Sequence, residues 1–173
     1  MGFPQEIGHI VLNVSDVEKS LEFYRDVIGF EVSSYRPGRS AFLTCGVIHH
    51  NLALFQASED AQPWRKGQIG LSHFAFKVTN YPSLQAAHQR LVEAEATIDH
   101  VTNHGVTRSV YFQDPDGITM ELFADAFPTN AEGLAYMKAG SEGREGRGGG
   151  ALDITAPEPP QPVIRQAEAT PVH

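Results

Sequence analysis

A weak internal repeat runs through residues 1–127 of this chain. Two apolar, alternating runs, residues 7–14 and 71–78, each carry a histidine at the third position, His9 and His73. Alternation of this kind indicates a half-buried β-strand. A small unit that buries one face of its sheet leaves the other face exposed, and a second unit is needed to cover that exposed face. The repeat therefore predicts one domain built from two related halves.

Each of these strands is followed by a helical pattern and then by three short strand-like runs. The first helical pattern opens with a capping box at residues 15–18 and ends at Gly29, and the second begins near residue 82. The strand-like runs cover residues 31–35, 40–44, 50–55, 96–101, 108–112 and 118–123. Each half is thus predicted to be a βαβββ module. The expected fold class is α+β, with modules at about 5–60 and 69–127 that pair into one cup-shaped, partly open β-barrel domain over residues 1–127.

The composition changes after residue 127. Residues 128–173 are rich in glycine and proline. Such a segment buries too little apolar area to offset its ordering entropy, so we expect a flexible C-terminal tail. An alternative is that Leu134, Tyr136 and Met137 form a short helix that packs on the domain or on a partner subunit.

Charge and cysteine content exclude several classes of protein. The chain has 13 Lys+Arg against 21 Asp+Glu, a net charge of −8, which argues against binding to nucleic acid or to an anionic membrane. Cys45 is the single cysteine, so no intramolecular disulfide can form. No apolar run is long enough to span a membrane, and residues 1–6 lack a signal-peptide pattern. We therefore expect a cytoplasmic protein.

Three residues are candidate metal ligands. His9 and His73 hold the same place in the two halves, and Glu121 lies among apolar residues in the last predicted strand. A carboxylate on a core strand is costly unless it is paired or binds a cation. Two imidazoles and one carboxylate form a facial triad, which suits non-haem Fe(II) and also accepts Mn(II) or Zn(II). Ala53 aligns with Glu121 in the first half, so we predict one asymmetric site with three protein ligands.

The repeat and its ligand positions resemble the vicinal-oxygen-chelate superfamily, which includes glyoxalase I, bleomycin-resistance proteins and extradiol ring-cleaving dioxygenases. The resemblance covers residues 5–127. The stretch that contains His104, Tyr111, the Asp-Pro-Asp-Gly turn at 114–117 and Glu121 is similar to the C-terminal signature of the extradiol enzymes.

A second segment adds to this resemblance. His50, the second of two adjacent histidines, stands in a stretch similar to the one in which extradiol enzymes carry their acid–base histidine. His88, His100 and His173 match nothing in the family and are expected at the surface. The best-known extradiol enzymes carry two pairs of modules, whereas this chain has one pair.

The resemblance implies a single-domain extradiol dioxygenase of the catechol 2,3 type. Its Fe(II), with Mn(II) as the other possibility, would be bound by His9, His73 and Glu121. The implied substrates are a small aromatic diol of the catechol type and O2, and the implied catalytic residues are His50, His104 and Tyr111. Superfamily members often pair modules between chains, so a homo-oligomer, dimer or higher, is expected.

Two other functions stay open at this stage. The first is a metal-dependent glyoxalase-like isomerase or lyase. Such isomerases usually use a carboxylate in the first half of the repeat, and in this chain that position is occupied by Ala53. The second is a metal-free binding protein for a small molecule such as an antibiotic, which would leave the three candidate ligands without a task. A thiol-adding resistance enzyme would also need a cation-lined pocket for an oxyanion, which the sequence does not identify.

Overall fold

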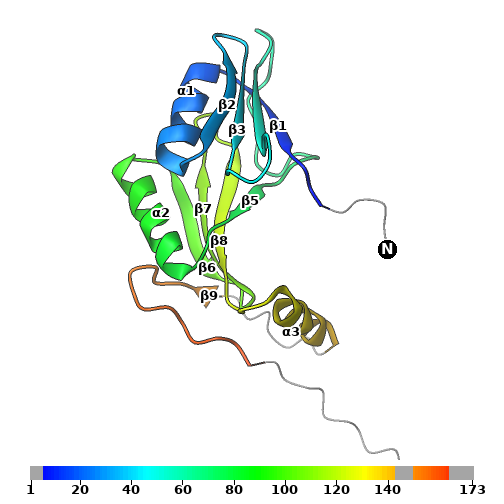
Figure 1. Ribbon diagram of the computed structural model, residues 1–173, viewed down its shortest axis with the longest axis vertical. Coiled ribbons are helices and arrows are strands. Elements are labelled where there is room, and N and C mark those ends of the chain that lie inside the picture. The colour runs from blue at the N-terminus through cyan, green and yellow to red at the C-terminus, as the bar shows by residue number, and fades with distance from the viewer. Residues whose placement is uncertain (1–5, 143–149, 164–173) are drawn as a thin grey trace, which may run out of the picture.

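Both halves of the repeat fold into a sheet with a helix on one side, as the computed structural model shows (Figure 1). The structure describes residues 6–142 and 150–163. The first module consists of β1 (Ile10–Val14), α1 (Val17–Glu22), the π-helical turn η1 (Phe23–Ile28), β2 (Glu31–Arg36), β3 (Ser40–Thr44) and β4 (Leu52–Gln56). Its strands form a sheet in the order β1-β4-β3-β2, with β1 and β4 parallel and the other pairs antiparallel.

The second module repeats this topology. It consists of β5 (Phe74–Lys77), α2 (Tyr81–Glu93), β6 (Ile98–Asn103), β7 (Thr107–Gln113) and β8 (Thr119–Asp125). Its sheet has the order β5-β8-β7-β6-β9, where β9 (Gly150–Ala151) comes from the C-terminal region. The prediction of an α+β fold with two βαβββ modules is confirmed. Over residues 6–142 and 150–163, however, the strands form two separate sheets that do not close into a barrel.

The ends of the first helix follow from local side chains. The predicted capping box at residues 15–18 is wrong in detail, because Asp16 is the N-cap and its carboxylate accepts a hydrogen bond from the Lys19 amide at 2.9 Å. The helix widens to π geometry over η1 and stops at Gly29, whose φ of +97° is a left-handed conformation that favours glycine. Helix α2 is capped in the same way by Asn80, whose side chain accepts from the Ser83 amide.

The Asp-Pro-Asp-Gly turn joins the two modules. One Asp114 oxygen accepts hydrogen bonds from the amides of Asp116 and Ile118, and the other accepts from the Tyr24 hydroxyl at 2.9 Å. The Asp116 carboxylate accepts from the Ser15 amide of the first module. Burial raises the pKa of Asp114, while its hydrogen bonds oppose that shift. The Asp-Pro-Asp-Gly turn therefore holds the helix of one module against the sheet of the other.

Apolar side chains fill the space between the helices and the sheets. The edge-to-face contact of Phe30 with Phe76, with ring centroids 4.9 Å apart, crosses the boundary between the modules, as does the contact of Phe23 with Phe112. These contacts and the Tyr24 hydrogen bond fix how the modules sit against each other. The fully buried members of the core include Val14, Val17, Leu43, Leu54, Leu84, Leu91, Phe112 and Met120.

Two parts of the C-terminal region have defined structure. Helix α3 (Asn130–Glu142) projects from the end of β8 (Figure 1), and the rings of Tyr136 and Phe127 are in contact. Leu134 and Met137 of the same helix are exposed. Residues 150–163 run along the second module, while 143–149 and 164–173 of the expected tail lie outside the described residues. In the described ranges no helix has the length and apolar character needed to cross a membrane.

Candidate functional site

Each sheet has one face covered by its helix and one open face. Residues such as Val110, Phe112 and Leu122 belong to the core shared with α2, and the residues between them in the sequence point to the other side. Because α1 and α2 lie on the same side of the molecule in Figure 1, both open faces point away from the helices. The candidate site residues of the second module lie on its open face.

Strand register gives the two open faces equivalent rows of residues. In the second module, Glu121 of β8 pairs with Ala75 of β5 and with Tyr111 of β7. The matching row of the first module consists of Ala53, Val11 and Phe42. His73 stands two residues before Ala75, just as His9 stands two residues before Val11. The register therefore agrees with the sequence alignment of Ala53 with Glu121 and of His9 with His73.

The structure brings His73 and Glu121 together. The His73 Nε2 atom lies 3.3 Å from Glu121 Oε2. The Glu121 side chain is 9% exposed, whereas the His73 side chain is 38% exposed and reaches the surface. None of the ion pairs between described residues gives Glu121 a lysine or arginine partner. A nearly buried carboxylate beside an imidazole is a donor pair that fits a divalent cation.

Tyr111 is the centre of a hydrogen-bonded group next to this pair. Its hydroxyl lies 3.0 Å from His104 Nε2, and Tyr111 stands opposite Glu121 in the ladder between β7 and β8. The His73 ring meets the Tyr111 ring edge to face at 5.3 Å. Burial, and secondarily the Glu121 charge, raises the pKa of Tyr111 well above its ordinary value. The hydroxyl therefore stays protonated at neutral pH and acts as a hydrogen-bond donor.

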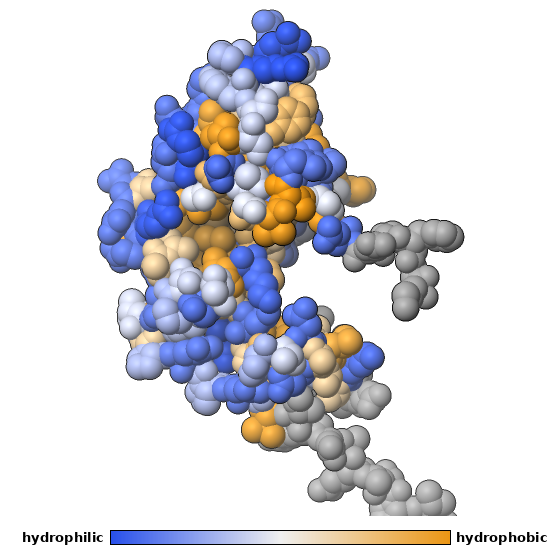
Figure 2. Space-filling model, in the orientation of Figure 1, coloured by the Kyte–Doolittle hydropathy of each residue, from blue (hydrophilic) through white to orange (hydrophobic). Residues whose placement is uncertain are grey.

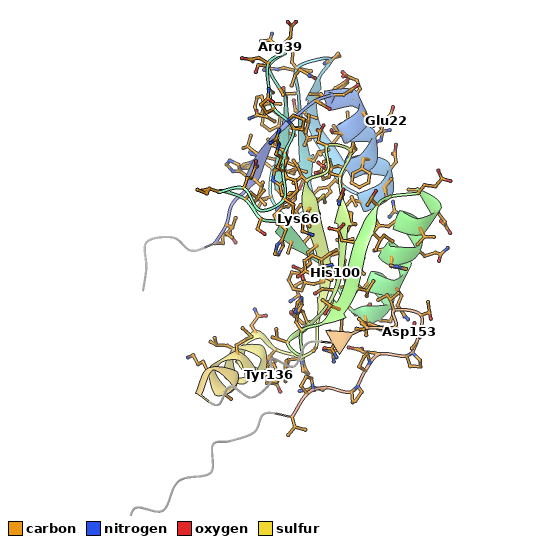
Figure 3. All side chains as sticks on the ribbon, turned by 180° about the vertical axis from the view of Figure 1, so that it is seen from behind. Glu22, Arg39, Lys66, His100, Tyr136 and Asp153 are labelled. Atoms are coloured by element: carbon orange, nitrogen blue, oxygen red, sulfur yellow. The ribbon has the colours of Figure 1, made fainter. Side chains whose placement is uncertain are left out.

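His100 is a member of this group that sequence reasoning placed at the surface. Its ring stacks on the Tyr111 ring with centroids 4.3 Å apart and an interplanar angle of 9°. Figure 3 shows His100 on the second-module sheet. The side chain is solvent-exposed, as predicted, but it is also part of the site.

A β-bulge places His100 beside Tyr111. On strand β6, Ile98 pairs with Phe112 but His100 pairs with Tyr111, so Asp99 is an extra residue in the ladder. In an unbroken register Asp99 would stand opposite Tyr111 and His100 would point to the helix side. The first module has a matching bulge between Val32 and Ser34. The bulge thus recurs in both halves, but it is set by pairing between strands, so no local sequence pattern places His100 beside Tyr111.

His9 and His50 lie together on the first module. Their ring centroids are 4.6 Å apart, and His50 also meets the Phe42 ring edge to face. The Nδ1 atoms of His49 and His50 are 2.5 Å apart. Burial, followed by the neighbouring His49 and His9, lowers the pKa of His50, so its imidazole is neutral at pH 7 and able to accept a proton.

The described part of a single chain does not gather the complete predicted ligand set. Within residues 6–142 and 150–163, no three His, Cys, Asp or Glu side chains come close enough to hold a metal ion. His73 and Glu121 are together on one open face, and His9 is with His50 on the other. The reason is that the modules join through their helices and the Asp114 turn, which leaves both open faces pointing outward.

Comparison with known proteins identifies the class to which this fold and site belong. The chain belongs to the Glyoxalase/Bleomycin resistance protein/Dioxygenase superfamily, whose family model matches residues 6–122. Two curated relatives are similar over most of that range. Biphenyl-2,3-diol 1,2-dioxygenase 2 of Rhodococcus globerulus is 33% identical over 132 residues, 76% of this chain and 69% of that protein. Glutathione transferase FosA of Serratia marcescens is 33% identical over 118 residues, 68% of this chain and 79% of that protein.

A solved structure extends the similarity to a third activity of the superfamily. Lactoylglutathione lyase from Agrobacterium tumefaciens superposes with a TM-score of 0.56 at 27% identity, covering 71% of this chain and 96% of that one. Membership of the superfamily is thus shown, and its members include dioxygenases, glyoxalases and fosfomycin-resistance proteins.

Proposed function

We propose that this protein is an Fe(II)-dependent extradiol dioxygenase that cleaves a catechol-type aromatic diol with O2. The observation that carries the proposal is the position of Tyr111: its hydroxyl lies 3.0 Å from His104, its ring meets His73, and it stands opposite Glu121. His104 and Tyr111 stand at the positions by which the sequence resembles extradiol enzymes rather than other superfamily members. The similarity to a biphenyl-2,3-diol 1,2-dioxygenase supports the same assignment.

The proposed metal ligands are His73 and Glu121 of one chain and His9 of a second copy. Val11 and Phe55, on the open face of the first module, have 51% and 39% of their surface exposed. Figure 2 shows apolar side chains at the surface of this half of the molecule. An apolar sheet face of this kind is normally covered. Placing it on the second module of another copy would cover it and would complete two equivalent sites by twofold symmetry.

The cation would be Fe(II), and Mn(II) is accepted by the same nitrogen and oxygen donors. When bound, Fe(II) would hold the two diol oxygens and O2 in contact and pass electrons between them. This is the chemistry that requires three protein ligands and open positions. Ala53, at the place that matches Glu121, supplies no fourth ligand.

The chain's own residues would orient the substrate and move its proton. His50, neutral at pH 7 and next to His9, would accept a proton from a diol hydroxyl. Tyr111, kept protonated by burial and by Glu121, would donate a hydrogen bond to a substrate oxygen. His104 would hold the Tyr111 hydroxyl in place. Val11 and Phe42 of the facing sheet would exclude water from the aromatic ring.

Oxygen uptake tests the proposed reaction. Protein loaded with Fe(II) under anaerobic conditions should consume oxygen when catechol or 2,3-dihydroxybiphenyl is added, and a coloured ring-opened product should form. His50→Phe should keep its iron and lose turnover. Protein that binds iron but consumes no oxygen across a panel of catechols would refute the assignment.

Subunit mixing tests the shared site. His9→Ala and Glu121→Ala should each be inactive, but a mixed dimer retains one intact pair of faces. Random reassociation of equal amounts should therefore restore about a quarter of the wild-type activity, because half of the dimers are mixed and each has one of two sites. No recovery, with mixed dimers demonstrated by mass spectrometry, would place all three ligands in one chain.

A second candidate function is a metal-dependent isomerase or lyase. It is supported by the similarity to a lactoylglutathione lyase and, more broadly, to FosA. Such an enzyme would turn over its substrate without oxygen, whereas ring cleavage stops when oxygen is removed. Anaerobic turnover therefore separates the two candidates.

A further inference from the structure

Residues 150–163, here named the strap, are attached to the second module at several points. Strand β9 pairs with the edge strand β6, with Ala151 opposite Thr102 and Gly150 opposite Asn103. Ile154 is 6% exposed and belongs to the hydrophobic core. Figure 1 shows the strap passing beneath α2. The strap is therefore a packed part of the domain.

Helix α2 holds the strap by two side chains. The Gln85 amide donates to the carbonyl oxygens of Ile154 and Ala156 at 2.8 and 3.0 Å. The Tyr81 hydroxyl donates to the carbonyl oxygen of Asp153 at 3.3 Å. Such bonds satisfy backbone acceptors that this proline-rich segment does not pair internally.

Arg108 connects the strap to the sheet. Its side chain is fully buried, and burial lowers its pKa. The Nη2 atom donates to the carbonyl oxygens of Pro159 and Pro160 at 3.4 and 3.2 Å. A buried guanidinium is expensive unless its donors are satisfied, so the strap supplies acceptors that this charge needs.

The other nitrogen of the same guanidinium, Nη1, hydrogen-bonds the turn that carries His104. Arg108 Nη1 donates to the Asn103 side-chain oxygen and to the Gly105 carbonyl oxygen, both at 2.9 Å. These two residues flank His104, whose Nε2 lies 3.0 Å from the Tyr111 hydroxyl. One side chain therefore bridges the strap and both neighbours of a candidate catalytic residue.

We propose that the strap, acting through Arg108, fixes the position of His104 and thereby of the Tyr111 hydroxyl. Arg108 is a positioning residue, because it touches the His104 turn and none of the reacting groups. The inference rests on the proposed function only for the catalytic consequence of that positioning. The C-terminal region outside the superfamily match is then part of the working enzyme.

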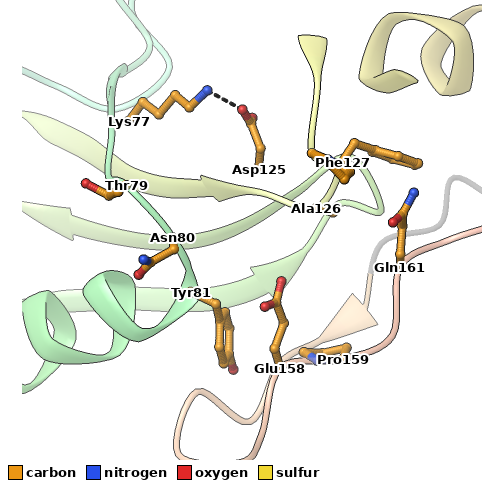
Figure 4. Close-up of a pocket in the computed structure, with 11 residues that line it drawn as sticks. Lys77, Thr79, Asn80, Tyr81, Asp125, Ala126, Phe127, Glu158, Pro159 and Gln161 are labelled. Carbon is orange, nitrogen blue, oxygen red and sulfur yellow. Dashed lines mark ion pairs between the residues drawn. The ribbon is translucent and has the colours of Figure 1, made fainter. Parts of the chain in front are cut away.

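The strap lies away from the open face that carries the candidate site residues. Glu158, Pro159 and Gln161 line a cavity of about 460 Å³, and Lys77 and Tyr81 line it as well (Figure 4). None of the residues that line this cavity is a candidate site residue. The strap therefore affects the site through the Arg108 hydrogen bonds and not by covering the substrate.

Two glutamines of α2 provide a matched test in the full-length, metal-free protein. Gln85→Leu removes the two hydrogen bonds from the Gln85 amide to the strap and leaves those of Tyr81 and Arg108. Gln89→Leu removes a similar hydrogen bond, to Glu93 at 3.0 Å, one turn further along the same helix and at the surface. The readouts are hydrogen exchange of strap amides and the NMR chemical shifts of the His104 ring. Gln85→Leu should speed exchange in residues 150–156 and shift the His104 signals, and Gln89→Leu should do neither.

Arg108→Met should shift the His104 signals in the same direction, and Arg108→Lys should restore part of the effect. If Arg108→Met does not fold, Gln85→Leu and Ile154→Ala still decide the question. Released strap amides with unchanged His104 signals would overturn the proposal, as would equal shifts in Gln89→Leu.

Activity measurements separate this inference from the proposed reaction. If the enzyme cleaves catechols, Gln85→Leu should lower kcat about tenfold with little change in KM, because misplacement of a catalytic group by about 1 Å costs up to about a hundredfold. An enzyme without oxygen uptake but with the expected His104 shifts would refute the dioxygenase assignment and leave the strap's positioning role intact.

Discussion

The hydrogen bond between Tyr24 and Asp114 offers a sharp test of what holds the two modules together. Tyr24→Phe removes one hydroxyl that lies 2.9 Å from the Asp114 carboxylate and leaves the ring contacts with Phe23 and Phe30 in place. Tyr24 is fully buried and Asp114 is 5% exposed. The substitution therefore creates almost no cavity, and its main effect is to leave a buried carboxylate oxygen without its donor.

The expected loss of stability follows from the charged acceptor. Hydrogen bonds to charged groups contribute about 1.5–3 kcal/mol, and an unsatisfied buried acceptor adds its desolvation cost. We expect the free energy of unfolding to fall by about 2–3 kcal/mol at pH 7, which corresponds to a decrease in Tm of about 4–12 °C for a domain of this size.

Tyr35→Phe is the matched control. The Tyr35 hydroxyl donates to the Glu18 carboxylate at 2.7 Å, a shorter distance, but this pair lies at the surface. Water replaces the lost partner there, so no measurable change in the free energy of unfolding is expected. The comparison isolates burial as the cause, because the chemistry of the two bonds is the same.

The pH dependence adds an independent check of the same reasoning. The Tyr24 hydrogen bond favours the ionised form of Asp114, so its removal raises the pKa of Asp114 further. A raised carboxyl pKa gives stability that is present at low pH and is lost as the pH rises through the folded-state pKa. The Tyr24→Phe penalty should therefore be smaller at pH 5 than at pH 8.

Urea unfolding followed by circular dichroism at both pH values measures these quantities. A change below about 0.5 kcal/mol for Tyr24→Phe, within the range of ordinary surface substitutions, would refute the argument. Equal effects of Tyr24→Phe and Tyr35→Phe would also show that burial does not decide the strength of these bonds.

Three further substitutions test the site and its supporting turn. Glu121→Gln should lower the pKa of Tyr111, because it removes the negative charge that opposes tyrosinate formation. Ultraviolet titration measures this pKa, with Tyr111→Phe identifying the Tyr111 signal, and an unchanged titration curve would contradict the prediction. His100→Ala should reduce oxygen uptake about two- to tenfold, whereas His100→Phe keeps the aromatic stack on Tyr111 and should retain most of the uptake. Equal losses in the two variants would refute a stacking role. Gly117→Ala should lower the unfolding free energy by about 1–2 kcal/mol in a thermal melt, because φ is +78°, whereas Gly8→Ala should be neutral.

Local sequence patterns predicted most of the secondary structure. The run at residues 40–44 was predicted as a strand and forms β3 with those bounds. Both helices follow the expected strands, and Gly29 ends the first helix as expected. These features depend on neighbouring residues only, through side-chain periodicity and the backbone freedom of glycine, so they can be inferred before the fold is known.

Features that depend on partners far away in the sequence were not predictable in the same way. Asp16, and not Ser15, caps the first helix, and the Glu18 carboxylate accepts hydrogen bonds from Tyr35 and Gly38 instead. The place of His100 depends on a one-residue bulge that reverses which face a side chain occupies. Neither the strand β9 nor the core position of Ile154 is evident in a segment rich in glycine and proline.

The repeat, and with it the equivalence of His9 with His73 and of Ala53 with Glu121, can be read directly from the chain, because both halves follow the same periodicity. That His73 and Glu121 meet, while His9 lies with His50 on a separate face, became visible only in the folded molecule. The modules are joined through buried contacts of Tyr24, Asp114 and the aromatic core, and these contacts fix the direction of the open faces. Periodicity says which side of a strand is open, but long-range packing decides what that side faces.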